Sequence, residues 1–573
     1  MKRGFLVFIL LSLVLGTLAA AYIPQQVIPL NDDIYADMDD LYLLEGIGTP
    51  SNSRPWTMNE AKAILSVVEV KDLKGAAKKL YDALSKALGK DLRWTFPDEF
   101  SLGADLDVAL EFYAHTNTDL ADGFTSHEDW IYGFVDRKPL LKLQLDMAVS
   151  DFFYTYCDLQ YGYGLFSYGD VLANLSDPSA PDLVGALIPD TSQVDLEYVD
   201  GSSVLAQYSN AFSNNLLSAS RDFDFQWPKR AVLSLGGEKW NFSVSRDKLS
   251  WGNSSIGNFI IDDHVDFHEY ARLSIYTEYF KYEAVGVFFD TYYASNDFFR
   301  MLMAHRLEFR PVHKVTFAVS ENVMYQNDQF DLRFLNPAFI YHNLNERDMF
   351  NAIAHVELDY TPVPGIHLYT QFALDQAVAP NENPDTEDTA WGLLAGFEYA
   401  LDLNEGVFST ALEGSLALPS MYRRDKVDFL MARRYAGLMY WGAQKFDYIG
   451  SPYGGDVVVV KWDTRYRKID SAEFAFSLTS VWKGGVDMYT PISSGETYTD
   501  YGTKLFTEDL ITFSLIGSLG CSVDLSHVLN NLVSCSLYGQ LDGILIMDYL
   551  QSTEAFDNQR SDLQLSVGMA VSL

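Results

Sequence analysis

The sequence is poor in cysteine and, after its first segment, has no long apolar run. Three cysteines, Cys157, Cys521 and Cys535, provide no disulfide framework, and no Cys-x-x-Cys pair is present. Cys521 and Cys535 could face each other across one hairpin, or all three could be isolated thiols on apolar faces. Beyond residue 21 no stretch reaches the roughly 18 consecutive apolar residues of a membrane-spanning helix.

Positive charge is also scarce. The chain has 41 Lys and Arg against 78 Asp and Glu, a formal net charge of -37. Such a charge repels phosphate backbones, so nucleic acid is not an expected partner. It favours cations, or polymers approached through neutral groups. The alternative is that the acidic residues only keep loops and a lumen hydrated.

The chain opens with MKRGFLVFILLSLVLGTLAAAYIP. A basic end, an apolar core and a small-residue Ala-x-Ala site follow one another in the order of a secretory signal peptide. We predict that residues 1–21 are this signal, cut before Tyr22, with an uncleaved membrane anchor as the alternative. The loss of Lys2 and Arg3 would bring the mature chain to about -39, and the protein is expected to be exported.

From Phe100 onward, apolar residues recur at every second position. FSLGADLDVALEFYA alternates an apolar face, which suits lipid, with a face that carries Asp105, Asp107 and Glu111. LLKLQLDMAVS repeats the pattern with Asp146 among its polar residues, and the chain ends on DLQLSVGMAVSL in strict alternation. A soluble β-sandwich also alternates, so the period by itself does not decide between the two folds.

Three features favour a transmembrane barrel. Many strands reach the roughly 9 to 11 residues that cross a bilayer at a tilt. Aromatic residues crowd strand ends, as in Phe288-Phe289 with Tyr292-Tyr293, where an interfacial girdle is expected. The last strand can close on the first and leave no edge in lipid. We predict that residues 94–573 form an all-β transmembrane barrel of roughly 16 to 18 antiparallel strands. The acidic residues predicted to face its lumen are Asp105, Asp107, Glu111 and Asp146.

Residues 22–93 have a helical period and predict a small periplasmic helical bundle. In NDDIYADMDDLYLLEG, Asn31 can cap a helix that Gly46 ends. TMNEAKAILSVV places Thr57 and Glu60 at capping-box spacing. KDLKGAAKKLYDALSKALGKD sets apolar residues on one side and several lysines on the other. These lysines could contact lipid phosphates, or they could form a solvated helix face.

The order of these features is similar to that of the capsule assembly protein Wzi family, outer-membrane barrels with a small periplasmic helical bundle. The helical head, PLNDDIYADMDDLYLLEGIG followed by RPWTMNEAKAIL, resembles that family's amino-terminal signature. SRDKLSWGNSSIGNFIIDD resembles its Arg-Asp, Trp-Gly and polar-loop segment, although Ser245 stands where glycine is expected. FLNPAFIYHNL, GIHLYTQFALDQ and YIGSPYGGDVVVVKWDTRYR give weaker matches downstream.

The resemblance implies surface organisation of polysaccharide rather than chemistry, because Wzi-like proteins are associated with holding capsular polysaccharide at the outer surface. Sugar sites combine aromatic faces with Asn, Asp or Arg at an exposed position. We expect the strand that begins at Trp240 to leave the bilayer at the loop near Trp251. Candidate polysaccharide-binding residues are Arg246, Asp247, Trp251, Asn253, Asn258, Asp262 and Asp263.

Each candidate also has a structural interpretation. Trp251 could be a girdle or loop-packing residue, because interfacial tryptophan is ordinary in membrane proteins. Gly252 and Gly257 could supply turns, and Arg246 and Asp247 could pair inside the lumen.

Motifs for catalysis are weak. HEYAR at His268 begins like the zinc motif H-E-x-x-H, but Arg272 stands at the second histidine position. Gly252 and Gly257 frame neither a nucleophile elbow nor a phosphate loop. We therefore expect no enzyme activity, no cofactor and no metal site.

Two functions from different classes stay open, with a structural or adhesive surface protein as a third. The first is a polysaccharide-binding or assembly barrel with a plugged lumen, and the second is a cation-favouring channel lined by the acidic residues. Bulky inward Tyr, Trp and Arg would favour plugging. The expected location is the outer membrane. Expected partners are outer-membrane lipid, possible surface polysaccharide and the barrel assembly machinery for insertion.

Overall fold

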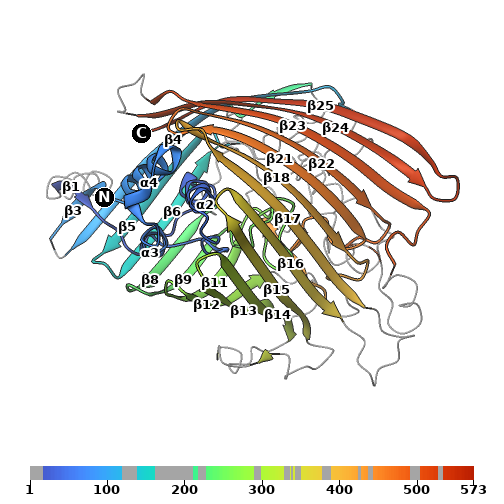
Figure 1. Cartoon of the computed structure of the whole chain (residues 1–573), viewed down its shortest axis with the longest axis horizontal. Helices are drawn as coiled ribbons and strands as arrows, with labels where there is room; N and C mark the ends of the chain where they lie inside the picture. Colours follow the sequence, from blue (N-terminus) through green and yellow to red (C-terminus); the bar gives the residue numbers. More distant parts are fainter. Residues whose placement is uncertain are drawn as a thin grey trace, which may run out of the picture.

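The computed structural model describes residues 17–97, 99–118, 138–161, 211–216, 228–289, 299–327, 336, 340–341, 350–376, 389–423, 427–435, 443–488, 490, 504–526 and 533–573. Within these residues, eighteen antiparallel strands close into one barrel and three α-helices gather at one of its ends (Figure 1). The predicted fold class, a barrel of roughly 16 to 18 strands with a small helical bundle, is confirmed.

Neighbouring barrel strands pair in chain order, and the last strand pairs with the first. Gln564 lies opposite His115 and Ser572 opposite Asp107, so the wall leaves no lateral gap at this seam. The barrel strands are β4 Phe100–His115, β5 Leu141–Val149, β6 Phe153–Tyr161, β8 Ala231–Gly236, β9 Trp240–Asp247, β11 His268–Tyr276, β12 Phe280–Phe289, β13 Phe299–Val312, β14 Val315–Asn327, β15 Phe350–Val363, β16 Ile366–Gln376, β17 Ala390–Asp402, β18 Gly406–Ala417, β21 Val457–Lys468, β22 Ala472–Lys483, β23 Leu510–Asp524, β24 Ser534–Leu550 and β25 Ala555–Ser572. The remaining strands are β1 Thr17–Ala21, β3 Asp91–Phe96 and β7 Phe212–Asn214, which extend the barrel sheet, and the two-stranded pairs β2 Ser53–Arg54 with β10 Ser250–Trp251 and β19 Leu430–Tyr435 with β20 Ala443–Tyr448.

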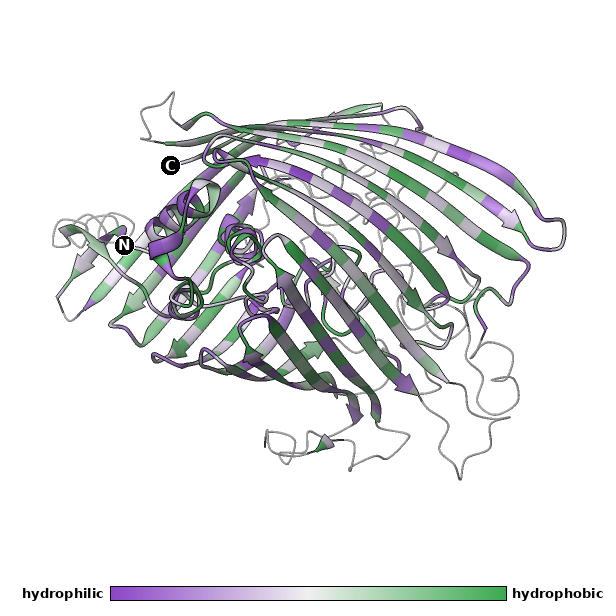
Figure 2. Ribbon diagram, in the orientation of Figure 1, coloured by the Kyte–Doolittle hydropathy of each residue, from purple (hydrophilic) through white to green (hydrophobic). Residues whose placement is uncertain are grey.

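Side chains alternate between lipid and lumen along the strands. In β15, Val356 and Leu358 are exposed on the outer face, whereas His355 and Glu357 between them are buried inside. Hydrophilic and hydrophobic bands alternate along the ribbons in Figure 2. The predicted alternation at the end of the chain is confirmed, because its apolar residues are exposed on β25: Leu563, Leu565, Val567 and Met569.

The two ends of the barrel differ in the length of their connections. At one end, seven hairpin turns of two or three residues join consecutive strands: 150–152, 237–239, 277–279, 313–314, 364–365, 403–405 and 469–471. We call this the short-turn end. At the other, the long-loop end, connections such as 162–230 and 418–456 join the strands. Outer-membrane barrels turn their short connections to the periplasm.

Aromatic side chains meet on the outer face near both ends. At the short-turn end, the rings of Phe280 and Phe309 lie 5.4 Å apart. At the long-loop end, Trp482 lies 4.6 Å from Phe513, and Tyr549 lies 5.0 Å from Phe556. Two bands of this kind are the girdles expected at the edges of a bilayer. Phe288 is 40% exposed, and its predicted companions Tyr292 and Tyr293 lie outside the described residues.

The helical head begins with α2 Asp33–Glu45, which is capped by the side chain of Asp32 rather than by Asn31 as predicted. Asp32 Oδ1 accepts a 3.0 Å hydrogen bond from the Ile34 amide, which lies two residues inside the helix. Gly46 ends the helix as predicted, with φ at +68°.

Two further helices complete the head. Thr57 caps α3 Met58–Leu65 as predicted, through a 3.2 Å bond from the Glu60 amide. The Glu60 side chain pairs with Lys281 of the barrel wall instead, so the predicted capping box is only half formed. The lysine-rich segment starts with a 3₁₀ turn at Val70–Asp72 before α4 Gly75–Ala87.

The helical head has its own core and rests on the short-turn end of the barrel. Met38, Leu41 and Trp56 are fully buried in it. Backbone bonds fasten it to barrel turns, including one of 2.7 Å from the Gly365 amide to the Leu43 carbonyl. Among the described residues, none of the helices is long and apolar enough to cross a membrane.

The strand β1 lies within the predicted signal peptide and pairs with β3, Ala21 opposite Asp91. The signal peptide stays a prediction. If it is removed before Tyr22, β1 leaves with it and that edge of β3 becomes free.

Candidate functional site

The segment between β9 and β11, residues 248–267, folds back into the barrel. Trp251 has no exposed surface, and β10 pairs with β2 of the helical head, Ser250 opposite Arg54 and Trp251 opposite Ser53. The strand β9 does end just before this segment, at Asp247, but the expected exposure of the loop near Trp251 is wrong. We call residues 248–267 the inner loop.

Two glycines allow the inner loop to turn back on itself. Gly252 has φ at +124° and Gly257 at +137°, a region that side-chain-bearing residues rarely adopt. A Cβ at Gly252 would overlap the side-chain oxygen of Asn258, and one at Gly257 would overlap the ring of Pro452. Their predicted use as turn residues is confirmed.

Polar side chains tie the inner loop to four strands of the barrel wall. Asn253 donates a 3.0 Å bond to Asp359 of β15, and the Gln371 amide of β16 donates a 2.7 Å bond to Asn258. Ser254 Oγ donates a 2.6 Å bond to Glu413 of β18. Ser255 Oγ donates a 2.9 Å bond to Asp463 of β21. The polar residues of the loop therefore point at the wall.

A buried cluster of charges joins the inner loop, the wall and the helical head. We call Glu60, Arg272, Lys281 and Glu283 the charge cluster. Lys281 Nζ lies 2.6 Å from Glu60 and 3.2 Å from Glu283, and it also donates a 2.8 Å bond to the Ser53 carbonyl. Arg272 pairs with Glu283 and donates to the Pro55 carbonyl. All four side chains are nearly fully buried, so each charge is balanced by an opposite one.

Part of the connection between β18 and β21 fills the lumen beside the inner loop. The Tyr422 hydroxyl donates a 2.8 Å bond to the Phe259 carbonyl. Trp251 and Phe259 share one apolar core with residues of that connection such as Phe429 and Ile449, and with inward residues of the strands. The lumen at this level is therefore packed like a protein interior.

Six of the seven candidate binding residues lie in or beside the lumen, whereas Arg246 lies on the outer face of β9, in line with the exposed Trp240, Phe242 and Val244. Asp247, Trp251, Asn258 and Asp262 are buried, whereas Arg246, Asn253 and Asp263 are partly exposed. The alternative that Arg246 and Asp247 pair with each other is wrong, because Arg246 pairs with Glu269 and Asp247 lies 2.9 Å from Arg230.

Asp262 and Asn258 also bond to each other within the loop. Asp262 accepts bonds of 2.7 Å from the Asn258 amide and 2.8 Å from His264 Nδ1. Burial and the neighbouring Asp262 carboxylate raise the pKa of Asp263. Their predicted sugar binding stays a prediction.

The four acidic residues predicted to face the lumen lie on the inner wall of β4 and β5, and three of them have partners. Asp146 pairs with Arg93, and Asp107 accepts a 2.8 Å bond from Gln144. Glu111 accepts a 2.5 Å bond from Tyr538. Asp105 is exposed to solvent.

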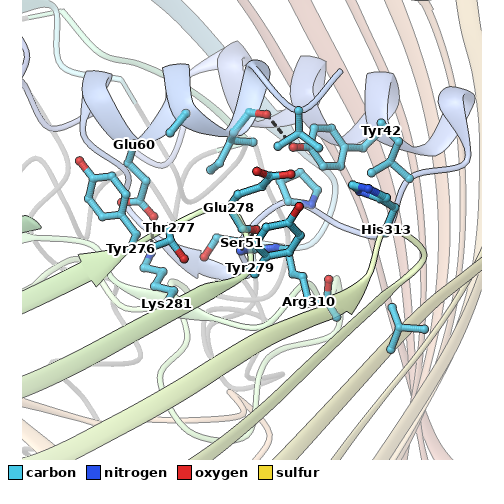
Figure 3. Close-up of a pocket in the computed structure, with 18 of the residues that line it drawn as sticks. Tyr42, Ser51, Glu60, Tyr276, Thr277, Glu278, Tyr279, Lys281, Arg310 and His313 are labelled. Carbon is cyan, nitrogen blue, oxygen red and sulfur yellow. Dashed lines mark hydrogen bonds and ion pairs between the residues drawn. The ribbon is translucent and has the colours of Figure 1, made fainter. Parts of the chain in front are cut away.

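Two cavities lie between the helical head and the wall. One of about 40 Å³, enough for one or two waters, separates Tyr42 and Glu60 of the helices from Tyr276, Lys281 and Arg310 of the strands (Figure 3). A larger one of about 390 Å³ is lined by charges of both signs, including Asp39, Arg54, Glu398 and Arg465. Arg54 holds Asp39 by two 2.7 Å bonds, and Arg465 lies 2.8 Å from Asp40.

Cysteine and histidine side chains do not gather into a reactive site in the part of the chain that is described. Cys521 lies opposite Gly539 and Cys535 opposite Val571, so the two do not face each other, and all three cysteines are free. No group of three His, Cys, Asp or Glu residues within the described ranges could hold a metal ion. His268 Nδ1 instead accepts a 3.1 Å bond from the Leu249 amide.

Sequence reasoning missed the residues that connect the helical head to the barrel. Arg465 and Arg467 of β21 reach Asp37 and Asp40 of α2 across more than 400 positions of sequence. Both arginines lie on the inner face of β21, and no local signal in the sequence names their partners.

No protein-family model and no curated protein matches this sequence. Among solved structures, Wzi from Escherichia coli is described as an outer-membrane protein involved in group 1 capsule assembly and as a carbohydrate-binding β-barrel. It aligns with 95% of this chain over 98% of its own length, at a TM-score of 0.55 and 12% identity. OccK3 of Pseudomonas aeruginosa aligns with 82% of this chain over 95% of its own, at a TM-score of 0.38 and 9% identity. OccAB4 of Acinetobacter baumannii aligns with 83% over 100%, at a TM-score of 0.35 and 9% identity. The fold is that of an outer-membrane β-barrel, and the resemblance to Wzi is confirmed at the level of the fold.

Proposed function

We propose that this chain is an outer-membrane protein that binds or organises surface polysaccharide at its long-loop end. The observation that carries the proposal is the packed part of the lumen: Trp251, Phe259 and Tyr422 lie inside the barrel in one apolar core with inward residues of strands β11 to β22. A plugged barrel serves as a scaffold for its outer surface. The similarity of fold to a barrel described as carbohydrate-binding supports the same function.

The proposal includes an orientation and a set of partners. Short turns face the periplasm in such barrels, so the helical head would lie in the periplasm and the long loops outside the cell. Export would follow from the predicted signal peptide, and insertion from the barrel assembly machinery. Lipid and surface polysaccharide are the proposed partners. We propose no catalytic activity, no cofactor and no nucleic acid partner.

Groups that suit sugar hydroxyls are present on the described surface at the long-loop end. The turn between β24 and β25 exposes Gln551 and Ser552, and Ser552 Oγ donates a 2.8 Å bond to Asp509. Asn558, also exposed, donates a 2.7 Å bond to Asp548. Amide and carboxylate groups of this kind bond hydroxyls while staying accessible.

The test is polysaccharide retention by cells and by the purified protein. Deletion of the gene is expected to release cell-bound polysaccharide into the medium, and the purified full chain is expected to pull that polysaccharide down. A double variant with Gln551→Ala and Asn558→Ala should bind less, whereas Glu238→Ala, exposed at the short-turn end, is the matched control. Unchanged retention on deletion, together with no pulldown, would reject the proposal.

A cation-favouring channel is the second candidate. It is supported by Asp105, which is exposed, and by the acidic wall that it shares with Asp107. Single-channel recording in planar bilayers separates the two candidates: steady cation-selective openings would favour the channel, and their absence the plugged scaffold. A mainly structural or adhesive protein would show neither polysaccharide release nor conductance.

A further inference from the structure

The strongest feature that the proposed function leaves unused is a cluster of positive charge on the helical head. Residues 71–90 contain six lysines and two aspartates, a net charge of +4 on a chain of -37. We call the six the lysine face: Lys71, Lys74, Lys78, Lys79, Lys86 and Lys90.

The lysine face is solvent-accessible and mostly unpaired. The opposite side of α4 packs into the head through Ala76, Ala77, Leu80 and Leu84, each at most 2% exposed. Two lysines on the outer side have partners, Lys78 with Asp82 at 2.5 Å and Lys79 with Glu405 at 2.6 Å.

The other four lysines of the face, Lys71, Lys74, Lys86 and Lys90, are exposed and form no ion pair with any residue that the structure describes. In contrast, several arginines inside the barrel wall meet a carboxylate, as Arg306 meets Glu357 and Arg272 meets Glu283. The lysine face therefore has charge left for an external partner.

Both ends of the lysine face lie at the rim of the barrel. The Ala76 amide donates a 2.9 Å bond to Asp402, at the turn that also holds Glu405. Beside these residues, Leu401 is 39% exposed on the outer face and Leu403, in the turn, is 47% exposed.

At the other end of α4, Lys90 precedes β3. Leu92 on that strand is 63% exposed, on the side opposite the buried Arg93. Lys79, which pairs with Glu405, and Lys90, two residues before Leu92, thus lie near leucines of the outer surface, at the level where the apolar band of a barrel gives way to lipid headgroups.

We propose that the lysine face is a docking surface for anionic phospholipid headgroups of the leaflet at the short-turn end. Lysines close to such a surface gain attraction that adds up over several side chains, while the remaining negative charge of the chain is repelled. The contact would fix how deeply the barrel sits and would hold α4 against the rim. The inference rests on the barrel fold alone and is independent of polysaccharide binding.

The test is lipid preference of the full chain in detergent, measured by native mass spectrometry with equal amounts of phosphatidylglycerol and phosphatidylcholine. The wild type should retain phosphatidylglycerol in preference. A triple variant, Lys74→Gln with Lys86→Gln and Lys90→Gln, should lower that retention by about tenfold or more. The matched control removes three exposed lysines from other turns and strand ends at the same barrel end: Lys239→Gln, Lys314→Gln and Lys468→Gln. Its retention of phosphatidylglycerol should stay within about twofold of the wild type.

Further measurements keep the result decisive. Heat-modifiable migration on gels shows whether each variant is folded, and Lys→Arg changes at the same three positions should retain the preference. Rising salt should weaken the wild-type preference, because exposed charges are screened. The proposal is overturned if the lysine-face variant equals the wild type, or if both triple variants fall alike. It is also overturned if the wild type shows no lipid preference and binds soluble dextran sulfate through the same lysines.

Discussion

The indole nitrogen of Trp251 donates a 2.9 Å hydrogen bond to the carboxylate of Glu283. The same carboxylate pairs with Arg272 and Lys281, which in turn hold the backbone of the helical head at Pro55 and Ser53. The buried Glu283 side chain of β12 therefore joins the inner loop to the segment of the helical head that contains Ser53 and Pro55. This segment comes from the short-turn end, whereas the inner loop follows β9 at the long-loop end.

Replacing Trp251 should loosen the inner loop. Trp251→Ala removes a fully buried aromatic side chain and should destabilise the packed lumen by about 3–5 kcal/mol. Trp251→Phe keeps most of the packing and loses the bond to the charged Glu283, for a cost of about 1.5–3 kcal/mol. Hydrogen exchange of residues 248–267 measures the loss, and planar-bilayer recording shows whether the lumen opens.

Trp240→Ala is the matched control for this change, because Trp240 is 39% exposed on the outer face of β9. It should leave exchange of the inner loop unaltered. Equal exchange in the Trp251→Ala variant and the wild type would contradict a structural role for Trp251.

The pair of Glu60 and Lys281 should hold α3 against the barrel. Glu60→Ala leaves a buried ammonium with fewer partners and should weaken docking of the helical head by about 3–5 kcal/mol. Adding Lys281→Met should recover part of that loss, because the cluster then again has one positive and one negative charge, Arg272 and Glu283. The rate of protease cleavage of the head in folded barrels measures the docking. If the double variant loses more docking free energy than the two single variants lose together, the result would argue against the pair.

The inner loop should not tolerate a side chain at Gly252. Gly252→Ala combines an unfavourable φ with an overlap on Asn258 and should cost about 1–3 kcal/mol or more. Gly543→Ala on β24 is the matched control, because a Cβ there meets no atom within 4 Å. Urea midpoints of the two variants in detergent compare the changes directly, and equal midpoints would show that the loop can adapt.

Stability of the helical head should fall as pH rises through the pKa of Asp37. Burial raises this pKa from its ordinary value to about 6, and Arg467 opposes the shift. The protonated carboxyl is favoured in the folded state, so its contribution is complete below about pH 4 and is lost by about pH 7, an effect on the order of 3 kcal/mol.

Asp37→Asn should flatten this pH dependence, whereas Asp72→Asn on the exposed 3₁₀ turn should keep it. The stability of α2 is measured by urea titration at several pH values, with hydrogen exchange of α2 as the readout. An unfolded reference at each pH corrects for the pH dependence of exchange itself. A profile that Asp37→Asn leaves unchanged would assign the pH dependence to another group.

Local patterns were enough to predict the barrel wall. Leu563, Leu565, Val567 and Met569 alternate with polar residues, and a bilayer outside the barrel accepts only one of the two faces, so period and orientation follow together. Gly46 and Thr57 also follow from local chemistry, because each satisfies backbone groups of its own helix.

The same reasoning failed for the inner loop because polar composition does not say which way a loop folds. Asn253, Ser254 and Asn258 have the character of exposed loop residues, yet each bonds a partner on the wall more than 100 positions away. Trp251 was compatible with lipid, sugar or a core, and only its position beside Glu283 distinguishes them.

The sequence by itself determined that this chain is a barrel with a helical head, because alternation and helix capping are set by neighbours a few residues apart. Only the tertiary structure decided that the lumen is packed. Closure of the barrel brings Trp251, Tyr422 and Glu283 into one space, and their burial depends on contacts between segments that no local pattern encodes.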